Sequence, residues 1–568
     1  MRKLVLVLLL VACGHSQAGP AAKRSAKVQA GTPGDARRPP RGADSAATLS
    51  DEAHLLSRRQ ADLVWRRWTT GEGPLPSGLV AQFPALTYPD SPRTAADAAA
   101  RASGEEAAAL RLLSAQLAGL AIAQQTAAET EALDRARAQL SYAAPGDAHG
   151  DRGERDLDKL LNGEPDAKKR FAIASAEAQA ARPLASLVLA RDAATERAIA
   201  SLGLGSWSDL QERIHRIPPV DLAVLAERTL AATEVVAARA VDEAASINLG
   251  TTRDRLRRAD LPRLVRSSSA DGEFPAGQAW EQVKLTFGAV GLDVPGVKVD
   301  AEPVPSKGAR PLALLVDPPA DVRLSLRSLG GYEEQRAALH EGARAAGGKL
   351  VDARHWELAQ LGEGSAAEGV AQLFEELAAE PEWLRERTKL RGEPLDDLVH
   401  AQAARRLLAA RRAAALVLFE IRRRSGQPSA EAQAALYRGL LQRATFAVLS
   451  DDDANRWALE ADTGIRAAPA LLGALLAAHL EEKLARPGQP WWKSPAGETL
   501  RPIWAGGRSF TAAEAAKTFG VAALDPEVLA RIADRRLSYQ APERPPPTSK
   551  PDYRYMQGDR KKRRARKK

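Results

Sequence analysis

The segment EAAALRLLSAQLAGLAIAQQTAAETEALDRARAQL, residues 106–140, decides the fold class. Its alanines and leucines recur at spacings of three and four residues, which is the period of an amphipathic α-helix. Similar stretches fill residues 49–245, among them residues 168–202, where we expect a break near Pro183 because proline cannot donate the helical hydrogen bond. Only 5% of the residues are aromatic, which favours helices over a β-sandwich. The sequence therefore predicts a mostly α-helical body.

A short β insertion is predicted between residues 299 and 326. Residues 312–316 form an apolar run, and residues 322–327 alternate apolar and polar side chains with the period of a half-buried strand. Pro318-Pro319 is expected to make the turn between the two strands. The second strand could pair with an extended peptide, or the two strands could form an internal lid, and the sequence leaves both open.

Helices are predicted again from Tyr332 to Arg535. Gly- and Pro-containing stretches are expected to break them at Gly347-Gly348, at residues 424–428 and at Pro487-Gly488. The first of these helices, residues 332–346, carries the candidate chemistry.

The charge of the chain is concentrated at its C-terminal end. Its 568 residues include 81 Lys and Arg against 72 Asp and Glu, a net charge of +9, and eight of the last nine residues, Arg560–Lys568, are basic. Without that tail the body is nearly neutral, which argues against a nucleic-acid-binding face. Cys13 is the only cysteine, so an intramolecular disulfide and a Cys-based zinc cluster are excluded.

The first residues are expected to be a targeting signal. Met1–Lys3 is basic, and residues 4–12 form an apolar run far shorter than the ~20 residues that a spanning helix requires. Residues 10–13, Leu-Val-Ala-Cys, resemble the bacterial lipobox, in which the cysteine is lipidated and becomes the mature N-terminus. We therefore expect Cys13 to anchor the protein in the bacterial envelope and, because Gly14 follows it, in the outer membrane facing the periplasm. A signal that is cleaved elsewhere and discards Cys13 is the alternative.

Two terminal regions are predicted to lie outside the core. Residues 13–50 contain Gly, Pro, Ala, Lys and Arg with hardly any large apolar side chain, which is typical of a disordered tether. Residues 537–568 form a Pro-rich and then basic tail, which is either a solvated charge run or an attachment to anionic lipid or wall polymer. Between them we expect an N-terminal helical lobe at residues 51–298 and a second lobe at residues 299–536.

The predicted helix at residues 332–346 contains part of a zinc-peptidase motif. Such a helix presents two histidines, at positions i and i+4, and a carboxylate after the first histidine that deprotonates the metal-bound water. His340 holds the first ligand position and Glu341 the general-base position, but the second ligand position is Arg344. Glu368, 24 residues after Arg344, opens a second predicted helix. It could also be part of a capping box, Ser365-x-x-Glu368, with no relation to a metal.

These segments resemble the zinc-peptidase group that contains the thimet oligopeptidase, oligopeptidase F and angiotensin-converting enzyme families, the gluzincins. The likeness covers roughly residues 180–536, and its best segments are residues 300–332, 366–375, 471–480 and 494–520. The resemblance implies a two-lobed helical metallopeptidase-like fold with a central cleft, in which residues 299–536 form the catalytic lobe. It also implies that Glu368 is the third zinc ligand.

Two departures predict a degenerate member of that group. Arginine has no acceptor lone pair and stays protonated, so Arg344 cannot bind a cation, and His340 and Glu368 are one ligand short of a catalytic set. The tyrosines that the group places before the Leu-Leu-Gly turn, where they would bind the oxyanion, are missing from residues 466–470. We predict that the Arg344 guanidinium occupies the place of zinc and pairs with Glu368, and with Glu341 in addition.

The expected function is that of an envelope lipoprotein with a degenerate peptidase domain that binds peptides or envelope proteins without cofactor and without catalysis. The first alternative is an active zinc-dependent oligopeptidase with an atypical site, in which His340 and Glu368 bind zinc and Glu341 is the base. The second is a structural helical lipoprotein that tethers membrane and cell wall. No nucleic-acid partner is expected.

Overall fold

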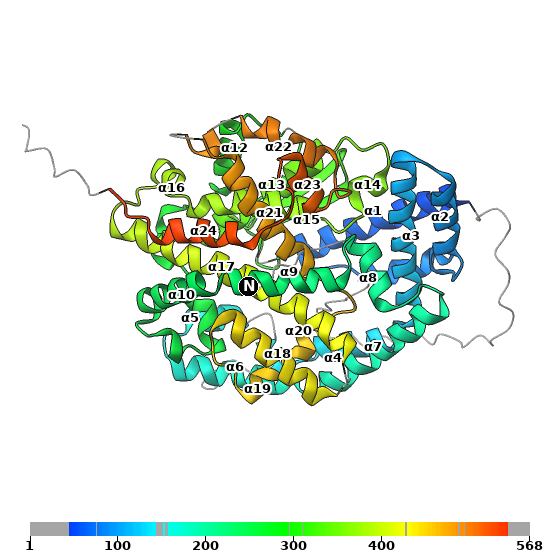
Figure 1. The fold of residues 1–568 in the computed structure, drawn as a ribbon, viewed down its shortest axis with the longest axis horizontal. Helices are drawn as coiled ribbons and strands as arrows, with labels where there is room; N and C mark the ends of the chain where they lie inside the picture. Colours follow the sequence, from blue (N-terminus) through cyan, green and yellow to red (C-terminus); the bar gives the residue numbers. More distant parts are fainter. Residues whose placement is uncertain are drawn as a thin grey trace, which may run out of the picture.

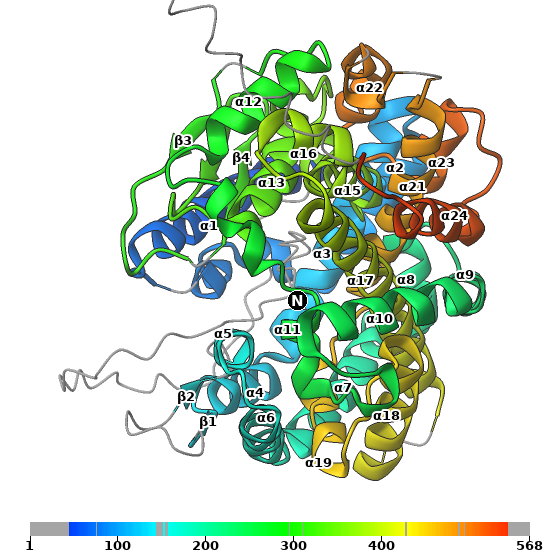
Figure 2. The same cartoon turned by 90° about the vertical axis from the view of Figure 1, so that its left-hand side faces the viewer.

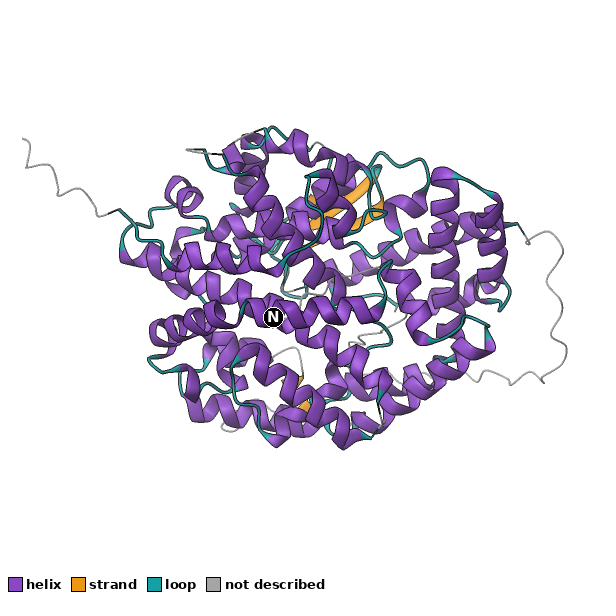
Figure 3. Cartoon of the chain, in the orientation of Figure 1, coloured by secondary structure: helices purple, strands orange, loops and turns teal. Residues whose placement is uncertain are grey.

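The computed structural model describes residues 45–542, except residues 75, 144–151, 154–156, 295, 309, 427–428, 487–488 and 494. Within these residues the protein is mostly helical, as predicted, and has two small β-sheets (Figures 1 and 3). The predicted signal peptide, Cys13, most of the tether and the basic tail from residue 543 lie outside the described residues. The largest core cluster of buried side chains extends from Ala118 to Leu537, and two smaller clusters involve the N-terminal helices.

The N-terminal helices begin earlier and break more often than predicted. Helix α1 (Ala46–Thr70) starts after Ser45, whose side chain accepts from the Thr48 amide, so the last residues of the predicted tether are helical. Residues 106–140 form two helices, α3 (Gly104–Gln125) and α4 (Ala127–Ala138), because the chain bends at the buried Thr126. Its hydroxyl donates to the Ile122 carbonyl (3.0 Å), a local bond that competes with helix continuation.

The break near Pro183 is confirmed, since α6 (Ala167–Ala181) ends before it and α7 (Leu184–Ser201) follows it. Helices from a distant part of the sequence pack beside this pair (Figures 1 and 2). They are α18 (Ala430–Thr445), α19 (Asp451–Ala454) and α20 (Trp457–Glu460). The longest helix, α17 (Glu393–Ser425), packs against five others, α9 (Pro219–Ala232), α10 (Glu234–Leu249), α18, α21 (Ala468–Leu484) and α24 (Pro526–Leu537). It ends within residues 424–428, where a break was predicted.

The other helices complete this arrangement. By length and composition α3 could cross a membrane, and half of its apolar window is buried in the core, as in many core helices. The other α-helices before the main sheet are α2 (Ser91–Arg101), α5 (Leu157–Gly163), α8 (Trp207–His215), α9 (Pro219–Ala232), α10 (Glu234–Leu249), α11 (Leu261–Leu264) and α12 (Ala279–Ala289). Short 3-10 helices are η1 (Pro76–Gln82), η2 (Pro84–Thr87), η4 (Arg253–Arg255), η5 (Arg258–Asp260), η6 (Ser268–Glu273), η7 (Glu376–Ala379) and η8 (Trp491–Lys493).

Both predicted strands are present in a three-stranded sheet. The order is β3 (Lys298–Asp300), β5 (Asp321–Ser325), β4 (Leu312–Asp317), with β4 antiparallel to β5 and β3 parallel to it. Because β5 is paired on both sides, the expectation that residues 322–327 could add an extended peptide is wrong. Helix α1 packs against β4. A second, two-stranded sheet joins β1 (Ser141–Tyr142) to β2 (Arg152–Gly153).

Helix α13 (Tyr332–Leu350) packs on the three-stranded sheet, against β4 and β5. It does not break at Gly347-Gly348, so the predicted break is wrong. A side-chain carbon at Gly348 would overlap Leu315 of β4, and one at Gly347 would lie 2.9 Å from Trp504 Cδ1. The two glycines let the helix approach the three-stranded sheet and α22 (Ala496–Ala505) closely, and this tertiary contact overrides their poor helix propensity.

Glycines also set the packing of α15 (Ser365–Glu375) against α21 (Ala468–Leu484). A Cβ atom at Gly473 would lie 2.9 Å from Glu368 Cγ, and one at Gly369 would lie 2.7 Å from Leu476 Cδ2. The close approach places α21 directly behind Glu368. The remaining α-helices of this half are α14 (Trp356–Gln360), α16 (Pro381–Arg387), α22 (Ala496–Ala505), α23 (Ala512–Thr518) and α24 (Pro526–Leu537).

Candidate functional site

Helices α13 and α15 pack against each other and bring the predicted residues together. His340 Nε2 lies 3.5 Å from Glu368 Oε2 and 3.8 Å from Glu341 Oε1. The side chains of His340, Glu341 and Glu368 are 7%, 11% and 3% exposed, so the cluster is nearly enclosed. These three residues and Arg344 are called the His340 site.

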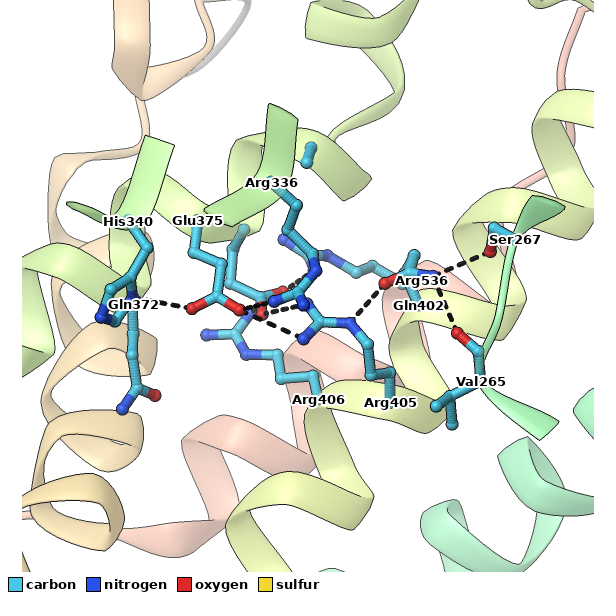
Figure 4. Close-up of polar contacts among 12 residues, drawn as sticks. Val265, Ser267, Arg336, His340, Gln372, Glu375, Gln402, Arg405, Arg406 and Arg536 are labelled. Atoms are coloured by element: carbon cyan, nitrogen blue, oxygen red, sulfur yellow. Dashed lines mark hydrogen bonds and ion pairs between the residues drawn. The ribbon is translucent and has the colours of Figure 1, made fainter. Parts of the chain in front are cut away.

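The second ring nitrogen of His340 faces a residue that sequence reasoning missed. His340 Nδ1 lies 2.8 Å from Glu375 Oε2 (Figure 4). Glu375 follows Glu368 by seven residues, about two turns, so both lie on one face of α15. That spacing is a signal which could have identified it. On the same face, Gln372 Nε2 donates to Glu368 Oε1 (2.9 Å) and to the Ala470 carbonyl (3.2 Å).

Arg344 stands beside the general-base position. Its Nη1 atom lies 3.5 Å from Glu341 Oε1, so the additional pairing that was predicted is present. The other oxygen, Glu341 Oε2, accepts the backbone amide of Ala313 on β4 (2.8 Å). Both carboxylate oxygens therefore face donors. The first predicted pairing, with Glu368, is wrong for the described residues, because the Glu368 carboxylate turns toward His340 and Gln372.

A second guanidinium, that of Arg508, lies at the start of α15. It donates to the Gly362 carbonyl (3.1 Å). Burial, together with the charge of Arg344, lowers the pKa of Arg508 to about 10. Burial also raises the pKa of Glu363 to about 7, although hydrogen bonds from Ser365 oppose this shift. Neither Arg508 nor Glu363 belongs to the sequence motif, and no spacing rule pointed to them.

The predicted capping box of Ser365 and Glu368 is wrong. The residue before the helix is Gly364, with φ of 72°, and Ser365 is already inside the helix. The Ser365 hydroxyl donates to Glu363 Oε1 and accepts the amide of Ala512 (2.6 Å). Glu368 is thus free of a capping role, and its side chain turns toward His340.

The donors of the His340 site do not fit a catalytic zinc ion. Such an ion needs three protein ligands and an open position for water. The second ligand position of the motif is held by the Arg344 guanidinium, which has donors only and repels a cation. Within the ranges that the structure describes, no group of three or more His, Cys, Asp or Glu side chains is arranged to hold a metal ion.

A chain of buried ion pairs extends from Glu375 away from the site (Figure 4). Glu375 Oε1 lies 3.1 Å from Arg405 Nη1 and also pairs with Arg336. The pairs continue through Glu376 with Arg405, Arg406 and Arg536, and through Glu481 with Arg406 (2.6 Å) and Arg536 (3.4 Å). We call these seven residues, Arg336, Glu375, Glu376, Arg405, Arg406, Glu481 and Arg536, the arginine network.

No family model matches the chain, and a comparison with curated proteins found no significant relative. The resemblance to the gluzincins therefore rests on the quoted segments and remains a prediction.

Proposed function

We propose that the protein is a lipid-anchored envelope protein whose metallopeptidase-like body has lost catalysis and binds peptides or proteins. In this proposal the helices form a two-lobed peptidase-type fold with a central cleft, and the His340 site is the remnant of its active centre. The mostly helical architecture, and the packing of α13 on α15 with His340 facing Glu368, support the proposal.

The observation that carries the proposal is the contact between Arg344 and Glu341. A general base must be free to take a proton from the attacking water. Glu341 instead faces a guanidinium at 3.5 Å and accepts a backbone amide at 2.8 Å. A permanent cation beside the base and in the second ligand position removes both the metal and the activated water from the mechanism.

An atypical working peptidase is the second candidate, and one observation favours it. Metal-binding histidines commonly donate their other ring nitrogen to a carboxylate, which orients the imidazole. Glu375 stands in the position of such a carboxylate, since its Oε2 atom lies 2.8 Å from His340 Nδ1 while Nε2 faces Glu368 and Glu341.

Zinc analysis of the purified protein separates the two candidates. We expect the wild type to hold much less than one zinc per chain and to leave quenched peptides uncut, with or without chelator. Arg344→His restores the second ligand position and should bring zinc binding close to one per chain, whereas Arg344→Gln, the matched control, should not. A wild type that binds one zinc tightly and cuts peptides until EDTA is added contradicts the proposal. Membrane attachment is tested separately with Cys13→Ser, which should release the protein from the membrane fraction.

A further inference from the structure

The guanidinium of Arg508, at the start of α15, forms no ion pair with any residue that the structure describes. Its Nη2 atom donates to the Gly362 carbonyl (3.1 Å), which is a neutral acceptor. Its Nε atom is buried and has no hydrogen-bond partner within the described ranges. Arginine stays protonated, and a charge held away from water without a close anion is strongly unfavourable. Arg508 therefore lacks a counterion.

Two glycines make room for this side chain. Gly364 has φ of 72°, and a Cβ atom there would lie 2.5 Å from Arg508 Nη2. A Cβ atom at Gly362 would overlap the Arg508 carbonyl oxygen. The loop thus holds a cation against the first turn of α15, which is the positive end of the helix dipole and favours an anion.

Arg344, on α13, adds a second positive charge. Its side chain is 11% exposed, and the long ion pair with Glu341, at 3.5 Å, leaves most of its N–H donors unused. Burial and the charge of Arg344 lower the pKa of Arg508, and the charges of Glu363 and Glu368 oppose this shift without cancelling it. Two guanidinium groups that repel each other share this end of α15.

The carboxylates around the two arginines are engaged by other donors. Glu341 accepts a backbone amide of β4, and Glu368 accepts from Gln372. Glu363 accepts from the amide and the hydroxyl of Ser365, and burial raises its pKa to about 7, so near neutral pH only part of the molecules carry a negative charge there. None of these carboxylates supplies Arg508 with an ion pair in the described part of the chain.

We propose that Arg344 and Arg508 bind an anionic oxygen group, and that in a bound peptide this group is the carboxylate at its carboxyl end. The paired N–H groups of a guanidinium match the two oxygens of a carboxylate. Both arginine side chains are partly exposed, so a small group can reach them. The inference rests on the proposed function, because it states which end of a bound peptide the site holds.

The test uses a pool of hexapeptides of randomised sequence with a fluorophore at the amino end. One pool has free carboxyl ends and the other has amidated carboxyl ends. Fluorescence anisotropy with the full chain measures the average affinity of each pool. We expect amidation to weaken binding to the wild type about tenfold or more, since it removes the charge that the guanidinium groups bind.

Variants of Arg508 show whether this side chain reads the carboxylate. In Arg508→Gln the pool with free carboxyl ends should bind as weakly as the amidated pool. Arg508→Lys keeps the charge but loses the paired donors, so it should retain part of the preference. Arg501→Gln, on the exposed surface of α22, is the matched control and should keep the full preference. Circular dichroism confirms that the variants fold, as we expect, because Arg508 has no ion pair to lose.

Inorganic phosphate tests the site without a peptide. At constant ionic strength, phosphate should raise the melting temperature of the wild type and of Arg501→Gln more than that of Arg508→Gln. Equal binding of the two pools to the wild type, or a preference that persists in Arg508→Gln, overturns the inference and leaves the proposed function intact. Stabilisation by phosphate that depends on Arg508, without binding of either pool, supports the anion site but contradicts a peptide as its occupant and with it the proposed function.

Discussion

The two ends of α15 carry acidic residues in opposite electrostatic settings. At the C-terminal end, Glu375 is paired with both Arg336 and Arg405 and is 3% exposed. The carboxylates Glu333 and Glu375 outweigh the cost of burial and raise the pKa of Arg336 above its ordinary value. Each charge there has partners close enough to compensate its loss of water.

At the N-terminal end the charges are poorly matched. Burial and the like charge of Arg344 lower the pKa of Arg508 to about 10, and burial raises the pKa of Glu363 to about 7. Charges that remain poorly compensated are characteristic of functional sites, whereas matched networks support a fold. The contrast indicates a structural role for the arginine network, and it is consistent with the proposal that the remnant of an active centre lies at the other end of α15.

The largest expected effect on stability comes from removing a charge at the C-terminal end of α15, where each charge has close partners. Glu375→Gln keeps the shape of the side chain but leaves Arg336 and Arg405 without their common anion. Removing one partner of a buried pair typically costs about 3–5 kcal/mol, and we expect the free energy of unfolding in urea to fall by that amount. The exposed Glu281→Gln should change it by no more than about 1 kcal/mol. Equal losses in the two variants would show that Glu375 has no special structural role.

At the N-terminal end of α15, the dependence of stability on pH tests whether the charges are poorly compensated. Glu363 has a pKa of about 7 in the folded protein against an ordinary value of 4.5. Between these values the unfolded chain releases its proton first, so this residue lowers the stability of the wild type as the pH rises. Glu363→Gln removes the effect. Relative to the wild type, the variant should gain up to about 3 kcal/mol in free energy of unfolding between pH 4.5 and pH 7. The exposed Glu498→Gln is the control, and a pH-independent difference for Glu363→Gln contradicts the prediction.

Periodicity predicted the elements that depend on local pattern. The helices, the strands at residues 312–317 and 321–325 and the break at Pro183 follow from spacing and from proline chemistry. The errors occurred where tertiary contacts decide the outcome. Gly347 and Gly348 were predicted to break the helix, but Trp504 and Leu315 fill the space that their missing side chains leave. A single sequence does not show which surface a glycine will face.

The sequence predicted those residues of the candidate site that belong to the zinc-peptidase motif. His340, Glu341 and Glu368 meet because two helices present them at fixed spacings, and Glu375 lies on the same face of α15. Arg508 could not be found in this way. It follows Glu368 by 140 residues and reaches the site only because the chain after α22 folds back over the start of α15.

The smallest effect is expected at Arg344 itself. Its side chain is as buried as that of Arg336, but its ion pair with Glu341 is long, at 3.5 Å, so we expect Arg344→Gln to lose less attraction than Glu375→Gln, which removes the common partner of two arginines. The same substitution relieves the repulsion of Arg508, which offsets part of that loss. We therefore expect the free energy of unfolding to change by no more than about 1 kcal/mol in either direction, close to that of the exposed control Arg501→Gln. A loss as large as that of Glu375→Gln would place Arg344 among the structural charges, and the contrast between the two ends of α15 would then disappear.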